Sequence, residues 1–251
     1  MSYSEELTRE MQADASTLNG DLSMLWARLA SVVAGRFKSP PASEYLLNGV
    51  CRRLDIVRRC MVRIFNTFSV DRKNPLDDKE RFDVEIALQC FMLNVYGILD
   101  NVAWVFLFER NAAPKRRQEV SLFSAKIGEH LPASLRDALD NPDIRSWHEK
   151  YVKPYRDALA HRIPLYVPPM GLDKTAEARS GELDEQILSA IKSRDIDSVE
   201  TLQKEQEGLG VALPAFVQSH WDEDAPPPMW LHPQVIVDAK TVLSILNAAF
   251  P

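Results

Sequence analysis

One stretch of the sequence combines an arginine, a carboxylate and a histidine at helical spacing, and its letters are YRDALAHRIP (residues 155–164). An arginine guanidinium can hold a phosphodiester and neutralise charge that develops on the phosphate oxygens. A histidine imidazole can take or give a proton at a ribose 2′-hydroxyl. The pattern therefore predicts RNA cleavage without a metal ion, with Arg156 and His161 as catalytic residues and Asp157 beside them.

The spacing of this motif sets a geometric condition. Arg156 and His161 are five residues apart, so on an ideal helix their side chains diverge by about 140°. They converge only if the helix unwinds at its end, and we expect Ile163-Pro164 to unwind it, because a residue before proline avoids the α region. Asp157 lies four residues before His161, where it would orient the imidazole. A purely structural alternative stays open, since His161 near a helix C-terminus also complements the helix dipole.

The sequence predicts helices on both sides of the motif. Apolar residues recur at intervals of three and four, and no stretch alternates with a period of two, so we expect an all-α fold without strands. The most regular stripe spans residues 43–68, and a helix that is apolar nearly all round follows at 79–110. We expect a helical bundle with two long antiparallel helices.

Other helices are expected before and after this pair. The first stripe begins near Leu7 and is expected to break at Asn19-Gly20. A small helix is expected around 134–139, and a longer one, kinked or restarted at Pro154, ends near His161. The last part of the chain predicts a charged helix at 183–206 and a final helix at 233–249 that docks on the bundle.

The charge distribution divides the chain. Residues 1–165 hold 24 Lys and Arg against 22 Asp and Glu, whereas residues 166–251 hold six against 14. We therefore expect a helical bundle over 1–165 and an acidic helical C-terminal extension packed on it over 166–251. The net charge of −6 argues against indiscriminate coating of nucleic acid but leaves room for a local basic surface.

Polar residues interrupt the apolar helix at 79–110. Asn94, Gly97 and Asn101 follow each other at steps of three and four, with Asp100 beside them. Buried polar groups need partners, since an unpaired one costs about 1–3 kcal/mol. They are interpreted either as hydrogen bonds between helices or as the wall of an active-site cleft, with Asp100 and Asn101 as the cleft-wall candidates.

Arg52, Arg59 and Arg63 form a basic ridge on the face of the 43–68 helix opposite its apolar stripe. An ordinary solvated helix face explains such a ridge. The alternative is a contact surface for RNA or phosphate.

Several classes of function are excluded by motif. The sequence has no GxxxxGK[ST], GxGxxG, HExxH or GxSxG pattern, so we expect no cofactor and no metal site. Three cysteines at Cys51, Cys60 and Cys90 match no zinc pattern and predict reduced thiols in the cytoplasm. The polar N-terminus predicts no secretory signal. Residues 91–108 are apolar, but Asp100 near their middle favours a buried helix over a membrane span.

The 155–164 motif resembles the signature of the HEPN superfamily, helical bundles in which an arginine precedes a histidine by four to six residues. Here the pattern is Arg-x4-His, with the polar Asp157 after Arg156, in a bundle context covering 43–165. The resemblance implies a homodimer that joins two motifs in one cleft, and metal-independent ribonuclease activity of toxin or phage-defence type, with an antitoxin as a candidate partner. Other members have lost activity and serve as binding modules.

Two alternatives to the enzyme stay open. One is a non-catalytic helical module that binds a protein or RNA through the apolar helix and the acidic tail. The other is an autoinhibitory role for the acidic region 173–224, which would cover the ridge of Arg52, Arg59 and Arg63 as a mimic of nucleic acid.

Overall fold

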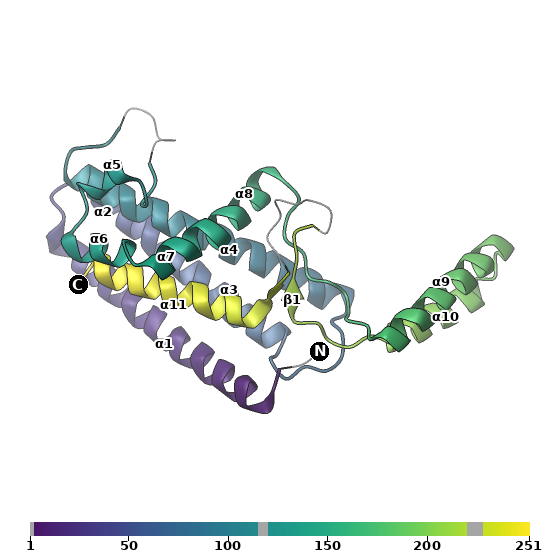
Figure 1. Ribbon diagram of the computed structural model, residues 1–251. Coiled ribbons are helices and arrows are strands. Elements are labelled where there is room, and N and C mark those ends of the chain that lie inside the picture. The colour runs from purple at the N-terminus through teal and green to yellow at the C-terminus, as the bar shows by residue number, and fades with distance from the viewer. Residues whose placement is uncertain (1–2, 115–119, 220–227) are drawn as a thin grey trace.

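Two long antiparallel helices joined by a short loop form the centre of the fold (Figure 1). The structure is a computed structural model that describes residues 3–114, 120–219 and 228–251. Helices α2 (Pro40–Glu44) and α3 (Arg52–Thr67) are joined through the π-helix η1 (Tyr45–Cys51) into one run, and α4 (Asp78–Glu109) packs along it. The structure is 74% helical, and the residues that it describes form only two short strands, so the expected all-α fold is confirmed.

The turn between α3 and α4 is fixed by local hydrogen bonds. Asp77 caps α4 in a capping box, in which its carboxylate accepts from the Glu80 backbone and Glu80 reaches back to the Asp77 backbone. Arg72 donates to both carboxylate oxygens of Glu80 and to the carbonyls of Asn74, Pro75 and Thr67. These contacts end one helix and start the next within ten residues.

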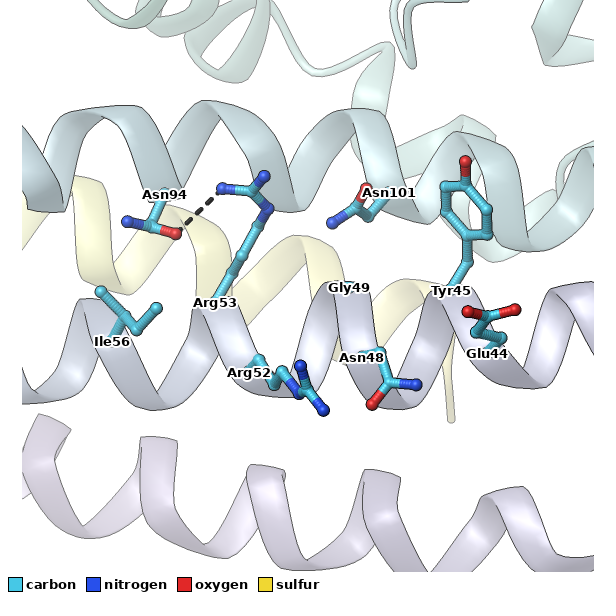
Figure 2. Close-up of a pocket in the computed structure, with 9 residues that line it drawn as sticks. All are labelled: Glu44, Tyr45, Asn48, Gly49, Arg52, Arg53, Ile56, Asn94 and Asn101. Atoms are coloured by element: carbon cyan, nitrogen blue, oxygen red, sulfur yellow. Dashed lines mark hydrogen bonds between the residues drawn. The ribbon is translucent and has the colours of Figure 1, made fainter.

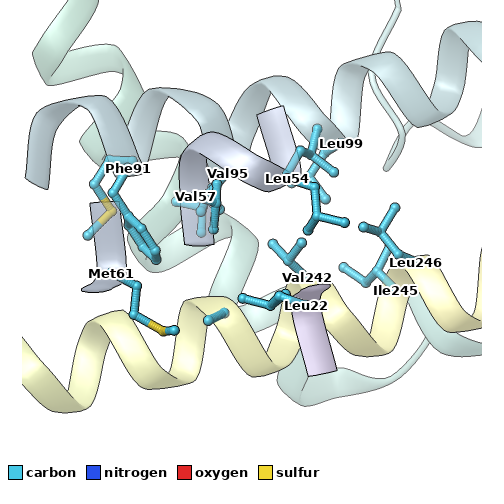
Figure 3. Packing of buried hydrophobic residues seen from close by; sticks show 14 of the residues in the cluster. Leu22, Leu54, Val57, Met61, Phe91, Val95, Leu99, Val242, Ile245 and Leu246 are labelled. Atoms are coloured by element: carbon cyan, nitrogen blue, oxygen red, sulfur yellow. The ribbon is translucent and has the colours of Figure 1, made fainter. Parts of the chain in front are cut away.

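Helices α1 (Glu5–Arg36) and α11 (Leu231–Ala249) complete the bundle. Helix α1 packs on α3 and α11, and α11 also packs on α4 (Figure 1). Side chains from all four helices meet in one core, shown in Figure 3 by the labelled residues Leu22, Leu54, Val57, Met61, Phe91, Val95, Leu99, Val242, Ile245 and Leu246. At about 25 cal/mol per Å² of apolar surface removed from water, this core is the main source of stability.

The expected break at Asn19-Gly20 is wrong, because α1 runs unbroken through it. A glycine in a helix interior costs only about 1 kcal/mol relative to alanine. Leu18 and Leu22 are buried on either side of Gly20, and their burial outweighs that cost.

A second helical run crosses the bundle on the side of α4. Small helices α5 (Ala125–Gly128) and α6 (Ala133–Leu139) come first. Helix α7 (Pro142–Trp147), π-helix η3 (His148–Val152) and α8 (Lys153–His161) then follow without a gap. The π-helix ends two residues before Pro154, the residue expected to kink the helix, and α8 begins at Lys153, directly before that proline.

The last part of the chain divides into two unlike pieces. Helices α9 (Lys174–Ser193) and α10 (Ile196–Gly208) pack on each other as a hairpin that extends away from the bundle, whereas α11 lies in the core (Figure 1). The expected single helix at 183–206 is therefore wrong: the chain turns at Arg194, which has a φ of 59°. Helix α11, from the acidic part of the chain, shares the core of residues 1–165.

The hairpin extends away from α3 (Figure 1), and Arg52, Arg59 and Arg63 are all exposed, so the described part of the acidic region does not cover the basic ridge. The expectation of no strands also needs correction. The two-residue strands β1 (Ala215–Phe216) and β2 (Met229–Trp230) pair antiparallel. They are too short to show a period of two.

Helix α4 is long and apolar enough to cross a membrane by length and composition. Two thirds of its most apolar window (67%) is buried inside the bundle, as in the core helix of a folded domain.

Candidate functional site on helices α3, α4 and α8

Helix α8 holds Arg156 against the outer face of α4. The Arg156 guanidinium lies 4.7 Å from the centre of the Tyr96 ring, and its Nη1 donates a 2.7 Å hydrogen bond to Asp157 Oδ1. Both side chains remain about one third exposed. Desolvation opposes the charge on Arg156, but the contacts with Asp157 and Tyr96 outweigh it and raise the pKa of Arg156. The arginine is thus fixed in place and open to a ligand.

His161 is the last residue of α8, and it is exposed. The backbone leaves the helix only at Arg162, whose φ and ψ are −130° and −157°. The unwinding expected from Ile163-Pro164 therefore begins after the motif, and within one chain the side chains of Arg156 and His161 diverge by about 140°. The expected convergence by unwinding is wrong for a single chain.

The expected pairing of Asp157 with His161 is also not formed. The Asp157 carboxylate accepts from Arg156 instead, and no hydrogen bond joins it to His161 among the residues that the structure describes. Charge-assisted hydrogen bonds between a guanidinium and a carboxylate are strong, and Arg156 takes the carboxylate.

Asp100 lies on α4 next to Arg156. Burial raises the pKa of its carboxyl to about 6, and the charges of Arg156 and Arg53 partly offset that rise. Asp100 thus lies near two guanidinium groups, one from α8 and one from α3. The structure brings this cleft-wall candidate together with Arg156.

The other cleft-wall candidate, Asn101, belongs to an open groove between α3 and α4. The groove encloses about 490 Å³. Figure 2 shows its lining: Glu44, Tyr45, Asn48, Gly49, Arg52, Arg53, Ile56, Asn94 and Asn101. Asn101 and Arg53 each approach the neighbouring helix closely, and they can do so only because the residue that each one faces is a glycine. A Cβ on Gly49 would lie 2.8 Å from the Asn101 amide nitrogen, and one on Gly97 would lie 2.6 Å from Arg53 Cζ.

Sequence reasoning missed Arg53. Its Nη1 donates a 2.9 Å hydrogen bond to Asn94 Oδ1 across the two helices. Asn94 is fixed in turn by donating to the Cys90 carbonyl. The sequence of the apolar helix α4 did offer a signal. Asn94 is a polar residue that needs a partner, and Gly97, one turn later, leaves space for a long polar side chain from a neighbouring helix.

The three ridge arginines do not act together. Arg59 forms an ion pair with Asp55, and Arg63 forms one with Asp83 of α4. Arg52 alone of the three lines the groove. The solvated-face interpretation therefore describes Arg59 and Arg63, while Arg52 stays available for a ligand.

An exposed apolar stripe runs along α4 beside the motif. We name as the α4 stripe the residues Phe82, Ile86 and Leu93, all of which are exposed. At about 100° per residue they share a face, within about 80°, with Tyr96 and Asp100. Large apolar residues exposed on one face are typical of protein interfaces.

The described residues contain no group of three or more His, Cys, Asp and Glu side chains placed to hold a metal ion. The three cysteines are free thiols. His148 and His232 are buried, and burial lowers the pKa of each imidazole to about 4. The chain matches no protein-family model, no curated protein and no solved structure.

Proposed function

We propose that this chain is a HEPN-like, metal-independent endoribonuclease whose cleft forms between two copies of the chain. The observation that carries the proposal is the position of Arg156. Its guanidinium packs on the Tyr96 ring, is partly exposed to solvent and lies beside the exposed α4 stripe. A phosphate-binding group next to a surface suited to a partner is what a cleft between subunits requires.

The chemistry follows from the two groups of the motif. Cleavage forms a bond from the 2′-oxygen to phosphorus and breaks the bond from phosphorus to the 5′-oxygen, which leaves a 2′,3′-cyclic phosphate. One imidazole takes the proton of the 2′-hydroxyl and another gives a proton to the departing 5′-oxygen, while Arg156 stabilises charge on the phosphate. Two copies of His161 in one cleft supply both proton transfers.

The homodimer also explains how Arg156 and His161 can act together although their side chains diverge within one chain. A second copy seated on the α4 stripe brings its own motif toward the first, so the cleft holds groups from both chains. An isologous contact of this kind, in which the same patch is used by both subunits, is the commonest arrangement of dimers.

The proposed activity places the protein in the cytoplasm, with RNA as substrate and a toxin or phage-defence role in which an antitoxin is the partner. The test is whether the purified chain cleaves a mixed RNA pool in EDTA to cyclic-phosphate ends, and whether His161→Ala removes that cleavage.

A non-catalytic binding module is the second candidate, and one observation favours it. Asp157 is engaged by Arg156, so in a single chain no described carboxylate orients His161. This candidate predicts that the wild type and His161→Ala bind RNA or a protein partner equally and that neither cleaves RNA.

A further inference from the structure

Two of the three free cysteines lie on the neighbouring helices α3 and α4. Cys60 belongs to α3 and Cys90 to α4, and both residues are half-buried. Neither has a role in the proposed ribonuclease chemistry. What the pair can do depends on whether the two thiols meet across the contact between the helices.

The contact between the two helices fixes their register. Arg53 of α3 faces Gly97 of α4, since its guanidinium occupies the space that a Cβ on Gly97 would fill. Figure 2 shows the two helices side by side at this point. Because the helices are antiparallel, a step forward on one matches an equal step back on the other. Seven residues make about two turns, so the same line of contact reaches Cys60 on α3 and Cys90 on α4.

The helices approach each other closely along this line. One turn before Arg53, a Cβ on Gly49 would lie 3.2 Å from the Asn101 Cβ. A disulfide needs its two Cβ atoms about 3.5–4.5 Å apart, so this spacing of the helices suits one. The Cys60 thiol is also hydrogen-bonded to Cys90. The two sulfur atoms therefore lie within reach of each other in the reduced protein.

The surroundings of the two thiols give them different chemistry. The side-chain amide of Asn94 donates a 3.4 Å hydrogen bond to Cys90 Sγ, and such a donor stabilises negative charge on the sulfur. Burial and the neighbouring Cys90 raise the pKa of Cys60 to about 12, so Cys60 keeps its proton. Because the thiolate is the nucleophile, Cys90 is the sulfur that attacks an oxidant and Cys60 is the one that completes the bond.

We propose that Cys60 and Cys90 form a reversible oxidation site, in which a peroxide converts the two thiols into a disulfide between α3 and α4. A dithiol reductant restores the thiols. The site goes beyond the proposed ribonuclease, because it needs neither Arg156 nor His161. Disulfides of cytoplasmic proteins are usually transient and often sense oxidants, which fits a pair that is reduced at rest.

The oxidation takes two steps. The Cys90 thiolate attacks one oxygen of hydrogen peroxide, so a sulfur–oxygen bond forms, the oxygen–oxygen bond breaks, and the hydroxide that leaves takes up the proton that Cys90 lost. The Cys60 sulfur then attacks Cys90 Sγ, forms the disulfide and displaces the hydroxyl group, which leaves as water with the proton of Cys60. The two thiols lose two electrons in total, and the peroxide is reduced to two molecules of water.

The test is mild oxidation of the full, folded chain with hydrogen peroxide, followed by alkylation of the remaining thiols and tryptic mass spectrometry. Trypsin cleaves after Arg53 and Arg59, so Cys51 and Cys60 fall in different peptides. We expect a linked pair of peptides that contain Cys60 and Cys90, the loss of two of the three free thiols, and the return of both after treatment with a dithiol reductant.

Three serine variants separate the roles of the cysteines. Cys51→Ser is the matched control, because Cys51 is also a free thiol but is buried, and this variant should form the disulfide like the wild type. Cys60→Ser should stop at the sulfenic acid of Cys90, which a 1,3-diketone probe traps. Cys90→Ser should form no disulfide and should slow the oxidation of Cys60 about tenfold or more, since a thiol with a pKa of about 12 is scarcely ionised at neutral pH.

The choice of partner in the folded chain decides the proposal. The same oxidation in urea should link the three cysteines in mixed pairs, because no fold then aligns them. A folded wild type that forms no link between Cys60 and Cys90 would overturn the proposal. A link that includes Cys51, or one that joins two copies of the chain on a non-reducing gel, would also overturn it. No RNA enters these assays, so their outcome is independent of the proposed ribonuclease.

Discussion

The guanidinium of Arg156 lies 4.7 Å from the centre of the Tyr96 ring, so a residue of α8 is positioned by an aromatic face of α4. A cation above an aromatic ring is stabilised by about 0.5–1 kcal/mol at exposed sites. Asp157 holds the same guanidinium from the side with a 2.7 Å hydrogen bond. The motif arginine is therefore oriented by two groups before any RNA arrives.

Removal of the Tyr96 ring tests this orientation. Tyr96→Leu should lower the rate of RNA cleavage about two- to fivefold, because the lost cation–π energy corresponds to a factor of that size. Tyr96→Phe keeps the ring face and should retain the rate. Single-turnover cleavage assays compare the two, and an equal loss in both variants would mean that the ring does not position Arg156.

The glycines at the α3–α4 contact should not tolerate a methyl group. In Gly49→Ala the new Cβ clashes with the side-chain amide of Asn101 and lies 3.2 Å from the Asn101 Cβ. The Asn101 Cβ cannot move away unless the backbone of α4 moves with it. We expect the free energy of unfolding to fall by about 1–3 kcal/mol. The Gly97→Ala clash is with the flexible end of Arg53, so it should cost less stability and instead displace Arg53 from Asn94.

Gly20→Ala is the control for these variants. A Cβ on Gly20 meets nothing within 4 Å, and helix α1 should gain about 0.5–1 kcal/mol from the better helix former. Urea unfolding measures all three variants. A stabilising Gly49→Ala would show that the close approach of Asn101 is not needed by the fold.

Asp238 should make stability depend on pH. This carboxyl of α11 is fully buried, and burial raises its pKa from 3.8 to about 7, although it accepts hydrogen bonds from Trp147 and Gln234. The folded protein therefore binds this proton more tightly than the unfolded chain. The contribution of Asp238 to stability is complete below about pH 4 and is lost as pH rises through about 7.

Asp238→Asn should remove that part of the pH dependence. The stability of the variant relative to the wild type should rise between pH 5 and pH 8, measured by urea unfolding at about these two values. The comparison cancels the opposite effects of His148 and His232, which lose stability as pH falls toward about 4. A difference between variant and wild type that does not change with pH would contradict the assignment.

The α4 stripe should carry the dimer. Ile86→Glu places a charge in the centre of the proposed interface, where burying it unpaired is costly, and should convert a two-copy species into single chains. Met24→Glu on α1 is the matched control, because Met24 and Ile86 are equally exposed at 66%. Light scattering after size exclusion gives the masses. A wild type that is already a single chain would contradict the homodimer.

The helical framework could be predicted from sequence because it follows from local pattern. Apolar residues at steps of three and four placed the two central helices at 43–68 and 79–110, close to the run that ends at Thr67 and to α4 (Asp78–Glu109). The hairpin turn at Arg194 was missed because a non-glycine residue rarely adopts a positive φ. The one local signal for it was Asp195, which caps α10 by accepting a hydrogen bond from the Ser198 backbone.

The candidate site could be predicted only in part. Arg156, Asp157 and His161 were found by spacing along one helix, but their contacts depend on Tyr96, which belongs to another helix. Arg53 was missed for the same reason, since its position depends on the space left by Gly97 across the α3–α4 contact. Tertiary contacts of this kind are set by packing, which one sequence does not reveal.

The most direct measurement is RNA cleavage by the purified chain in EDTA, with analysis of the product ends. The proposed ribonuclease predicts 2′,3′-cyclic phosphate ends from the wild type and from His130→Ala, a histidine outside the motif. It predicts no cleavage from His161→Ala or Arg156→Gln. Cleavage that persists in folded His161→Ala, or a wild type that binds RNA without cutting any strand of the pool, would contradict it.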